Sequence, residues 1–341
     1  MEQSEIRLEK PGRFSTGTGT LSDPTEGEAR IRIRRIGVCG TDIHAFHGRQ
    51  PFFEYPRILG HELAAEIVEL NGASEFSIGD TVTIEPYLND PGSPASMKGK
   101  SNCCESLQVL GVHTDGGMRP EINIPIRKMH KAASASVDQL ALVEMLGIGC
   151  HAVNRSQATK SDNALVLGTG PIGLSTLSFL QTHTTNVAVA DLDEGRLAFC
   201  REAFGVEHTI QVCPGESMET DLRNAFGGQL PDVIFDATGN RGSMLSTFDL
   251  AAHGGRIVFV GLFQGDAQFN DPNFHRRELT LMASRNAKSE EFSQVIAAME
   301  SGRINTEPWI THRMELAEVP EKFESVITDP GLRKAVIHLD G

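Results

Sequence analysis

The stretch ALVLGTGPIGLSTLSFL, residues 164–180, joins a short apolar run to a helical pattern through Gly168, Gly170 and Gly173. In a strand, loop and helix of this kind, the first glycine allows a tight turn and the second lets the backbone approach a pyrophosphate. The third glycine permits close packing of the helix on the strand, and the helix N-terminus offers amide groups to the anion. The same glycine spacing also arises by chance, so the surrounding sequence decides its interpretation.

On both sides of this loop, apolar runs alternate with helical stretches. The apolar runs are NALVLG, NVAVADLD, HTIQV, DVIFDATG and GRIVFVGLF, and the helical stretches include PIGLSTLSFLQTH and DEGRLAFCREAFG. Strands that alternate with helices are typical of a doubly wound parallel sheet, the Rossmann arrangement. We therefore predict an α/β fold with a dinucleotide-binding domain over residues 152–284.

The second apolar run ends at Asp191, 18 residues beyond Gly173. A carboxylate there accepts hydrogen bonds from ribose hydroxyls and repels a 2′-phosphate, which favours NAD over NADP. The alternative is that Asp191 or Asp193 only caps the following helix. The stretch DVIFDATG, residues 232–239, contains Asp236 and Thr238, which either border the adenosine side of the crevice or serve packing and turn geometry.

Shorter runs of β type fill residues 25 to 150. They are EARIRIRRIGV, LAAEIVEL, DTVTIEP and EINIPI, separated by Gly, Asn, Asp and Pro. We predict a mainly β domain over residues 1–151. After the parallel sheet, SEEFSQVIAAMESGRI has the pattern of an amphipathic helix, and GLRKAVIHLD that of a short strand. This tail, residues 285–341, either extends the parallel sheet or returns to the first domain, and we predict the return.

Bulk composition excludes several classes of function. A formal net charge of −14 over 341 residues argues against a surface for nucleic acid or anionic lipid. The N-terminus lacks the basic and apolar regions of a signal peptide, and no apolar run approaches the roughly 18 residues of a membrane span. The scattered cysteines indicate reduced thiols. We predict a cytoplasmic protein that acts on small molecules.

The β-rich part also contains Cys39, His61 and Glu62, in GVCGTDIHAFHG and RILGHELAAEIVE. Cys and His are common zinc ligands, and a catalytic zinc takes three protein ligands and keeps one position open. Taken singly, a buried Cys is more often a small hydrophobic residue, and a lone His a hydrogen-bonded core residue.

In combination, GVCGTDIH, GHE, the DGGM turn, LVEMLGIGCHAV and GTGPIGL followed by Asp191 resemble the medium-chain, zinc-dependent alcohol dehydrogenase family over nearly the whole chain. The segments are most similar to the polyol and sugar-acid branch, of the sorbitol dehydrogenase and L-galactonate 5-dehydrogenase type. The resemblance implies a GroES-like fold for the β-rich domain and one catalytic zinc bound by Cys39 and His61. Glu62 and Glu144 fall at two carboxylate positions, of which one binds zinc directly and the other through water or in alternation.

The resemblance also implies roles for other residues. Thr41 and His44 match proton-relay positions, with His47 nearby, and Arg285 matches a substrate-contacting arginine, although a plain surface salt bridge is its alternative. Arg119 is a weaker substrate candidate. The predicted cofactor-binding residues are Gly168, Gly170, Pro171, Ile172, Gly173, Asp191, Arg196 and Thr238.

The implied activity is transfer of a hydride from a secondary alcohol of a polyol or sugar acid to NAD. Two alternatives remain open: a zinc-free enzyme of the quinone-reductase type, and a catalytically inactive NAD-binding relative. The resemblance further implies a homodimer or homotetramer, with dimers formed by edge-to-edge pairing of the nucleotide-binding sheets.

One segment departs from the family pattern. The family's structural zinc lobe has four cysteines, and Asp90, Ser93, Ser96 and Cys104 occupy these positions here. Because serine hydroxyls are poor zinc ligands, we predict that the structural zinc is absent and that the glycine- and proline-rich loop is more mobile. Cys103 and Cys104 are then predicted to be leftover thiols.

Overall fold

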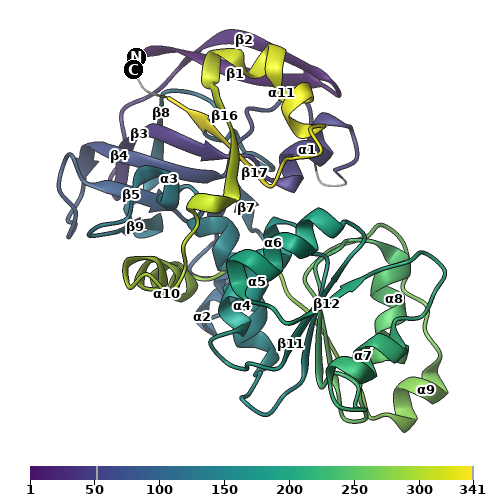
Figure 1. Cartoon of the computed structure of the whole chain (residues 1–341). Helices are drawn as coiled ribbons and strands as arrows, with labels where there is room; N and C mark the ends of the chain where they lie inside the picture. Colours follow the sequence, from purple (N-terminus) through teal and green to yellow (C-terminus); the bar gives the residue numbers. More distant parts are fainter. Residues whose placement is uncertain (51–52, 340–341) are drawn as a thin grey trace. The chain divides into compact units, whose positions relative to one another are not determined.

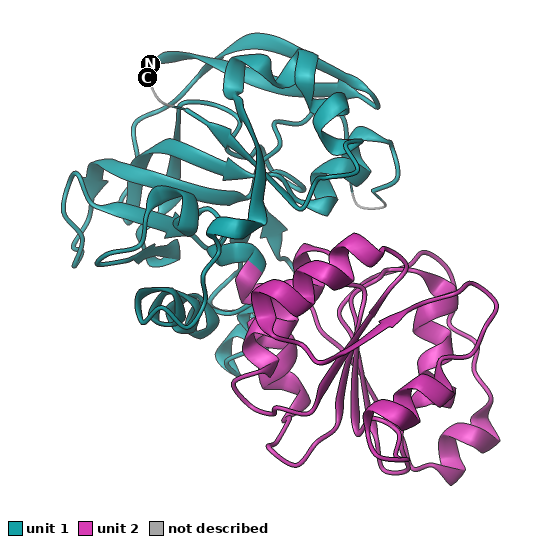
Figure 2. Cartoon of the chain, in the orientation of Figure 1, with its two compact units in different colours: residues 1–145, 287–341 teal, residues 146–286 magenta. Residues whose placement is uncertain are grey.

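The computed structural model describes residues 1–50 and 53–339. It forms two compact units, one of residues 1–145 with 287–341 and the other of residues 146–286 (Figure 2). The predicted α/β class is confirmed, because one unit is built on a parallel sheet and the other on a mainly antiparallel sheet. The domain limits at 151/152 and 284/285 stay predictions.

The second unit contains a six-stranded, fully parallel sheet in the order β12–β11–β10–β13–β14–β15 (Figure 1). This is the strand order of the Rossmann fold, with its switch point between the first and fourth strands, β10 and β13. The strands are β10 (Ala164–Leu167), β11 (Val187–Asp191), β12 (His208–Gln211), β13 (Val233–Asp236), β14 (Arg256–Phe259) and β15 (Thr280–Ala283). The helices are α5 (Pro171–Leu180), α6 (Glu194–Phe204), α7 (Glu219–Ala225), α8 (Arg241–Leu250) and α9 (Asp271–Arg276).

The central strands of this sheet are buried along their whole length, which explains their continuous apolar runs. Leu165, Leu167, Ala188, Ala190 and Ile234 belong to one hydrophobic cluster. At about 25 cal/mol per Å² of apolar surface removed from water, burial of such side chains is the main term that stabilises the sheet. The strands are apolar until their last residues, and the predicted cofactor-binding residues lie at or just after these carboxyl ends.

The first unit contains a seven-stranded sheet in the order β16–β17–β3–β4–β5–β9, in which β8 also pairs with β3, and two small sheets, β1–β2 and β6–β7. The long strands are β1 (Glu2–Lys10), β2 (Arg13–Thr20), β3 (Glu28–Gly37) and β4 (Glu62–Asn71). The shorter strands are β5 (Thr81–Ile84), β6 (Tyr87–Leu88), β7 (Gln108–Val109), β8 (Glu121–Pro125), β9 (Met129–Lys131), β16 (Ile310–Glu315) and β17 (Lys334–His338). The helices are α1 (Gly40–Phe46), α2 (Pro94–Met97), α3 (Val137–Leu140), α10 (Ser289–Glu300) and α11 (Val319–Ile327), and α4 (Val143–Ser156) starts here and continues into the second unit.

Strand β3 shows how the sequence pattern sets the core of this unit. Ile31 and Ile33 alternate with arginines and are fully buried, and the alternation breaks at Arg34–Arg35 before Ile36 is buried again. The register between β3 and β4 shifts at this point, between Ile33 and Arg35. A β-bulge absorbs the extra residue and returns Ile36 to the buried face.

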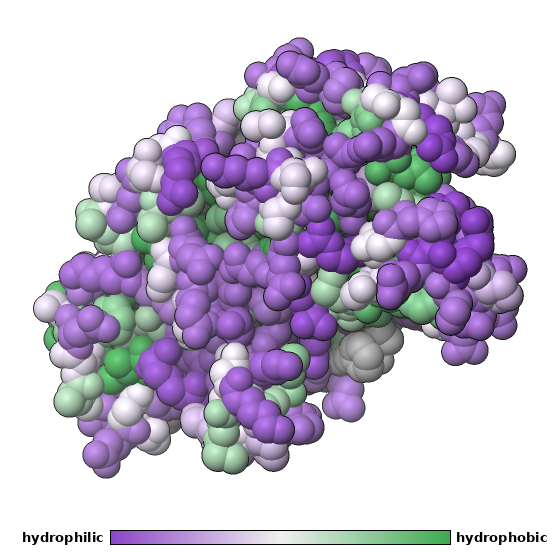
Figure 3. Space-filling view, turned by 90° about the horizontal axis from the view of Figure 1, so that it is seen from below, coloured by the Kyte–Doolittle hydropathy of each residue, from purple (hydrophilic) through white to green (hydrophobic). Residues whose placement is uncertain are grey.

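The C-terminal tail returns to the sheet of the first unit. Strand β17 pairs antiparallel with β3 and parallel with β16. The N-terminal hairpin of β1 and β2 was not predicted from the sequence. Figure 3 shows one face of the molecule, on which hydrophilic residues predominate and apolar ones are scattered. No helix in the described part of the chain has the length and apolar character that crossing a bilayer requires.

Candidate metal and cofactor sites

Adjacent strands of the first unit bring Cys39, His61 and Glu62 together. Strand β3 ends at Gly37 and β4 begins at Glu62, and these two residues are register partners. Cys39 follows β3 as the N-cap of α1, while His61 immediately precedes β4. A Cβ atom on Gly37 would lie 2.0 Å from Glu62 Oε2. Only glycine at position 37 therefore leaves room for the Glu62 carboxylate.

The donor atoms of Cys39, His61 and Glu62 lie within 4.8 Å of one another. His61 and Glu62 are buried, at 4% and 0% exposure. His61 Nδ1 and Glu62 Oε1 have no hydrogen-bond partner, whereas Glu62 Oε2 pairs with the ammonium of Lys334. Buried polar atoms are normally paired, so these orphaned atoms fit a bound cation. A thiolate, an imidazole and a carboxylate form a donor set that suits zinc.

Asp42 contacts both His61 and Cys39 of this group. Its Oδ1 lies 3.8 Å from His61 Nδ1, and its Oδ2 accepts a hydrogen bond from the Cys39 amide at 2.9 Å. Burial acts to lower the pKa of His61, but the charges of Cys39 and Asp42 outweigh it and hold that pKa well above its ordinary value. A metal ion requires neutral imidazole, so metal binding at this site releases a proton.

Glu144, in the first turn of α4, is the second predicted carboxylate. It is buried, and its Oε1 accepts a hydrogen bond from the hydroxyl of Tyr87 in β6. Burial raises the pKa of Glu144 to about 7, with Glu62 adding to the effect and His61 opposing it. Its carboxylate is not part of the group within 4.8 Å, which contains Glu62 instead.

Lys334 is the charge that faces Glu62. Its Nζ forms an ion pair with Glu62 Oε2 and donates a hydrogen bond to the Val38 carbonyl at 2.9 Å. Both side chains of the pair are at most 2% exposed. Lys334 opens β17, which pairs with β3 and so delivers the lysine to the end of that strand. Lys334, Asp42 and Tyr87 were not predicted from the sequence, in which the one local signal is a lysine directly before the apolar run AVI.

The phosphate loop has the geometry that its glycines predict. Gly168 has a φ of +81°, which favours glycine, and Gly170 is the N-cap of α5, which starts with Pro171 and Ile172. A Cβ atom on Gly173 would lie 1.8 Å from the Gly168 carbonyl oxygen. The loop therefore needs glycine at this position to pack closely on its own helix.

Asp191 and Asp193 take different roles at the end of β11. Asp193 caps α6 by accepting a hydrogen bond from the Arg196 amide at 3.1 Å, so the capping alternative applies to Asp193. Asp191 Oδ2 accepts hydrogen bonds from the backbone and hydroxyl of Thr169, at 2.6 and 2.9 Å. The Arg196 guanidinium lies 3.9 Å from the same oxygen. This carboxylate thus borders the phosphate loop directly.

Thr238 and Asp236 form the neighbouring strand end. Asp236 is fully buried and accepts hydrogen bonds from Thr238 Oγ1 at 2.6 Å and from Ser243 Oγ at 2.6 Å. Thr238 lies against Gly168, whose added Cβ would meet Thr238 Cγ2 at 2.9 Å. Asp236 therefore organises the turn, while Thr238 lies beside the phosphate loop.

The remaining predicted residues lie as follows. Thr41 and His44 are three positions apart on α1, with Thr41 half-buried and His44 exposed. Burial, Arg49 and His47 lower the pKa of His44. Arg285 follows β15 and is exposed. By contrast, the Arg119 side chain donates hydrogen bonds to the carbonyls of residues 115 and 116, and so it stabilises the turn that precedes it.

The segment at the structural-zinc positions is joined by hydrogen bonds. Ser93 caps α2 and its Oγ lies 2.9 Å from Ser96 Oγ, while the Asp90 amide donates to Cys104 Sγ at 3.4 Å. Hydrogen bonds from Ser106 and Ser93 lower the pKa of Cys104 to about 7. Cys104 is buried in this cluster and Cys103 is exposed.

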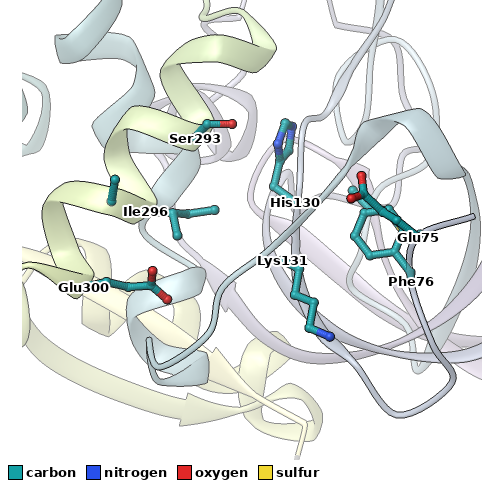
Figure 4. Close-up of a pocket in the computed structure, with 9 residues that line it drawn as sticks. Glu75, Phe76, His130, Lys131, Ser293, Ile296 and Glu300 are labelled. Carbon is teal, nitrogen blue, oxygen red and sulfur yellow. The ribbon is translucent and has the colours of Figure 1, made fainter.

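A separate cavity of about 360 Å³ lies in the first unit between α10 and β9 (Figure 4). It is lined by Glu75, Phe76, Met129, His130, Lys131, Ser293, Ile296, Ala297 and Glu300. Two of its charged side chains are already engaged, since Lys131 pairs with Asp80 and Glu300 accepts from two backbone amides. None of the predicted site residues lines this cavity.

Comparison with known proteins gives matches along most of the chain. Residues 25–134 match the alcohol dehydrogenase GroES-like domain, and residues 171–301 match the zinc-binding dehydrogenase domain. The chain is 40% identical to L-galactonate-5-dehydrogenase of Escherichia coli K12 over 316 residues, which cover 92% of each protein. It is 29% identical to 2-dehydro-3-deoxy-L-galactonate 5-dehydrogenase of Pseudoalteromonas atlantica, with 95% of each covered. The solved structure of RspB from Escherichia coli CFT073, complexed with the cofactor NADH, matches with a TM-score of 0.91 at 28% identity and 99% coverage of both chains.

Proposed function

The chain belongs to the zinc-type medium-chain alcohol dehydrogenase family, in its polyol and sugar-acid branch, and from this premise we propose that it oxidises a secondary alcohol of a sugar acid of the L-galactonate class with NAD. Family membership confirms the resemblance seen in the sequence and favours a dehydrogenase over an inactive relative. The single observation that carries the proposal is the buried group of Cys39, His61 and Glu62, in which His61 Nδ1 and Glu62 Oε1 have no hydrogen-bond partner.

These residues fit a catalytic zinc ion, which Cys39, His61 and Glu62 would hold, with Glu144 as the further carboxylate candidate. When bound, zinc acts as a Lewis acid that makes the substrate hydroxyl far more acidic. A zinc-free reductase has no use for a buried thiol, imidazole and carboxylate assembled in this way. Their presence therefore disfavours the quinone-reductase alternative.

The residues of α1 supply the proton path. Thr41 would accept the proton of the substrate hydroxyl, and His44, three positions further along α1, would be the next proton acceptor. His44 is exposed, and its pKa is lowered by burial of part of the ring and by Arg49 and His47, so it releases the proton to water near neutral pH. Bound NAD would supply the acceptor for the hydride that the substrate carbon loses.

The dinucleotide is bound by the loop of Gly168, Gly170, Pro171, Ile172 and Gly173 at the start of α5. Asp191 accepts hydrogen bonds from the adenosine ribose, with Arg196 and Thr238 beside it. The buried carboxylate of Asp191 disfavours a 2′-phosphate, which supports NAD rather than NADP. We assign these roles to residues 152–284 and the metal site to residues 1–151 with 285–341.

The choice of a sugar acid over a polyol is supported by the 40% identity to an L-galactonate dehydrogenase, against 27% to the sorbitol dehydrogenase of Halalkalibacterium halodurans. Arg285, exposed after β15, provides a guanidinium that suits a carboxylate. A polyol remains the second candidate because of the sorbitol dehydrogenase relative.

The test is NADH formation by the purified chain with L-galactonate, other hexonates, sorbitol and xylitol, each with NAD or NADP. A metal chelator should abolish the activity and added zinc should restore it. Cys39→Ser should lose both zinc and activity, whereas the exposed Cys213→Ser is the matched control. Turnover that survives the chelator, or no turnover with any hexonate or polyol, would contradict the proposal.

We also propose a homodimer formed at the edge strand β15, in a cytoplasmic protein. Strand β15 is the last strand of the parallel sheet, and Leu281 on it is 38% exposed. An uncovered sheet edge with apolar side chains pairs readily with a second copy. Light scattering distinguishes this dimer from a monomer and from a tetramer. All six cysteines are free thiols, which supports a reducing compartment.

A further inference from the structure

Tyr87 is a buried residue that the zinc-ligand pattern does not contain. It is 2% exposed, and its hydroxyl donates a hydrogen bond to Oε1 of Glu144, 57 residues further along the chain. A carboxylate has two oxygens, so a donor fixed on Oε1 leaves Oε2 for a metal ion or a metal-bound water. The orientation of Tyr87 therefore determines which way the Glu144 carboxylate faces.

The ring of Tyr87 is itself held by its neighbours. It packs edge-on against Phe292 of α10, with ring centroids 6.3 Å apart and an interplanar angle of 80°. Phe292 is fully buried and stacks on His130 of β9 at 4.9 Å. Aromatic pairs with such geometry contribute about 0.5–1.5 kcal/mol beyond the area that they bury. The phenol thus has little freedom to turn away from Glu144.

Polar contacts of Glu85 also join the segments around Tyr87. Glu85, two residues before Tyr87, is buried and pairs with Lys128. It also accepts a hydrogen bond from Ser289 Oγ, at the start of α10, at 2.5 Å. The residues that follow β5 and precede β9 are therefore joined to each other and to the start of α10, whose Phe292 packs against the Tyr87 ring.

We propose that Tyr87 is a positioning residue of the zinc site, which holds Glu144 with one oxygen toward the metal; this inference rests on the proposed function. The two carboxylates are held differently: Glu62 by the ammonium of Lys334 and Glu144 by the neutral phenol of Tyr87. The hydrogen bond to Tyr87 therefore orients Glu144 without giving it a counter-charge. Groups that orient metal-binding side chains typically change metal affinity by about 10–100-fold when they are removed.

The test compares Tyr87→Phe with Tyr55→Phe in the full chain. Tyr55 is the other of the two tyrosines, and its hydroxyl donates to the carbonyl of Ala45. Zinc affinity is measured by competition with a chromophoric chelator. We expect Tyr87→Phe to bind zinc about 10–100-fold more weakly than the wild type, and Tyr55→Phe to match the wild type.

Two further measurements separate positioning from a general loss of packing. In the cobalt-substituted protein, the visible absorption bands should shift in Tyr87→Phe and not in Tyr55→Phe, because these bands report the ligand geometry. In a Glu144→Ala background, Tyr87→Phe should lower zinc affinity by less than about twofold further, since a residue that acts through Glu144 has nothing left to orient.

Each outcome decides the matter. Tyr87→Phe with wild-type zinc affinity and cobalt spectrum would overturn the inference and leave the proposed function intact. An equal loss of affinity with and without Glu144 would also overturn it, because the tyrosine would then act on packing alone. A wild-type chain that binds no zinc would overturn both. If Tyr87→Phe fails to fold, the Glu144→Ala spectrum still decides: bands identical to the wild type would show that Glu144 is not oriented toward the metal.

Discussion

The ion pair of Lys334 and Glu62 makes a strong prediction about stability. Both side chains lie in the first unit, and the lysine's other hydrogen bond is to the Val38 carbonyl. Lys334→Met keeps most of the side-chain length and removes the charge, which leaves Glu62 buried without a counter-charge in the metal-free protein. Removing one partner of a buried pair costs about 3–5 kcal/mol. With a urea slope of about 2 kcal/mol/M, the midpoint should fall by about 1.5–2.5 M.

The chain offers a specific reporter for this measurement. Its single tryptophan, Trp309, is 2% exposed and lies in the same unit as Lys334, so its fluorescence follows unfolding of that unit. Lys131→Met is the matched control, because Lys131 pairs with Asp80 while being 48% exposed, and its loss should cost at most about 1 kcal/mol. Bound zinc should reduce the cost at Lys334, since it supplies positive charge to Glu62.

A double variant tests whether the cost of Lys334→Met comes from the charge of Glu62. Glu62→Gln removes the buried charge, so Lys334→Met should cost much less in that background than in the wild type. The reasoning is refuted if Lys334→Met costs under about 1 kcal/mol in the metal-free protein. It is equally refuted if the cost is unchanged by Glu62→Gln.

Three further predictions concern the cofactor and metal sites. Gly173→Ala would place a Cβ 1.8 Å from the Gly168 carbonyl, so NADH binding followed by nicotinamide fluorescence should weaken at least about tenfold, and unchanged binding would contradict the loop assignment. Asp191→Ala should reduce the preference for NAD over NADP in turnover, and an unaltered preference would remove Asp191 from the ribose site. Because burial raises the pKa of Glu144 to about 7 and the metal needs the ionised carboxylate, zinc affinity should rise with pH up to about 7. In Glu144→Gln that rise should be shallower by about one proton, and equal slopes in the two proteins would exclude Glu144 from the site.

The phosphate loop was predictable because its signal is local. Gly168 needs a positive φ and Gly173 packs on the Gly168 carbonyl, and the apolar strands β10 and β11 are buried along their whole length. The same holds for Ile31 and Ile33 on β3. The break at Arg34–Arg35 marks the bulge, and its sequence signal is the interruption of the alternating pattern.

The N-terminal hairpin was missed because its buried face is partly polar. Gln3 and Glu5 are 9% and 3% exposed, although they alternate like surface residues. Gln3 exchanges two hydrogen bonds of 2.9 Å with the backbone of Glu121, and Glu5 pairs with Arg7. Buried polar side chains, whose hydrogen-bond partners lie far away in the sequence, break the alternation of apolar and polar residues by which a strand is recognised.

The support of the metal site could not be read from the sequence for a related reason. Lys334 reaches Glu62 across more than 270 residues because β17 returns beside β3, and Tyr87 meets Glu144 through a two-stranded sheet and a helix. Neither pairing has a local periodicity. The ligand residues themselves were found through the family resemblance, and their roles stay predictions.

The most direct test of the whole account is a zinc titration of the metal-depleted chain, with NADH formation from L-galactonate measured at each step. The account predicts that activity rises linearly with added zinc and reaches its maximum at one ion per chain, with Glu62→Gln requiring far more zinc. Activity in the metal-depleted chain, or a maximum reached only at two ions per chain, would contradict it.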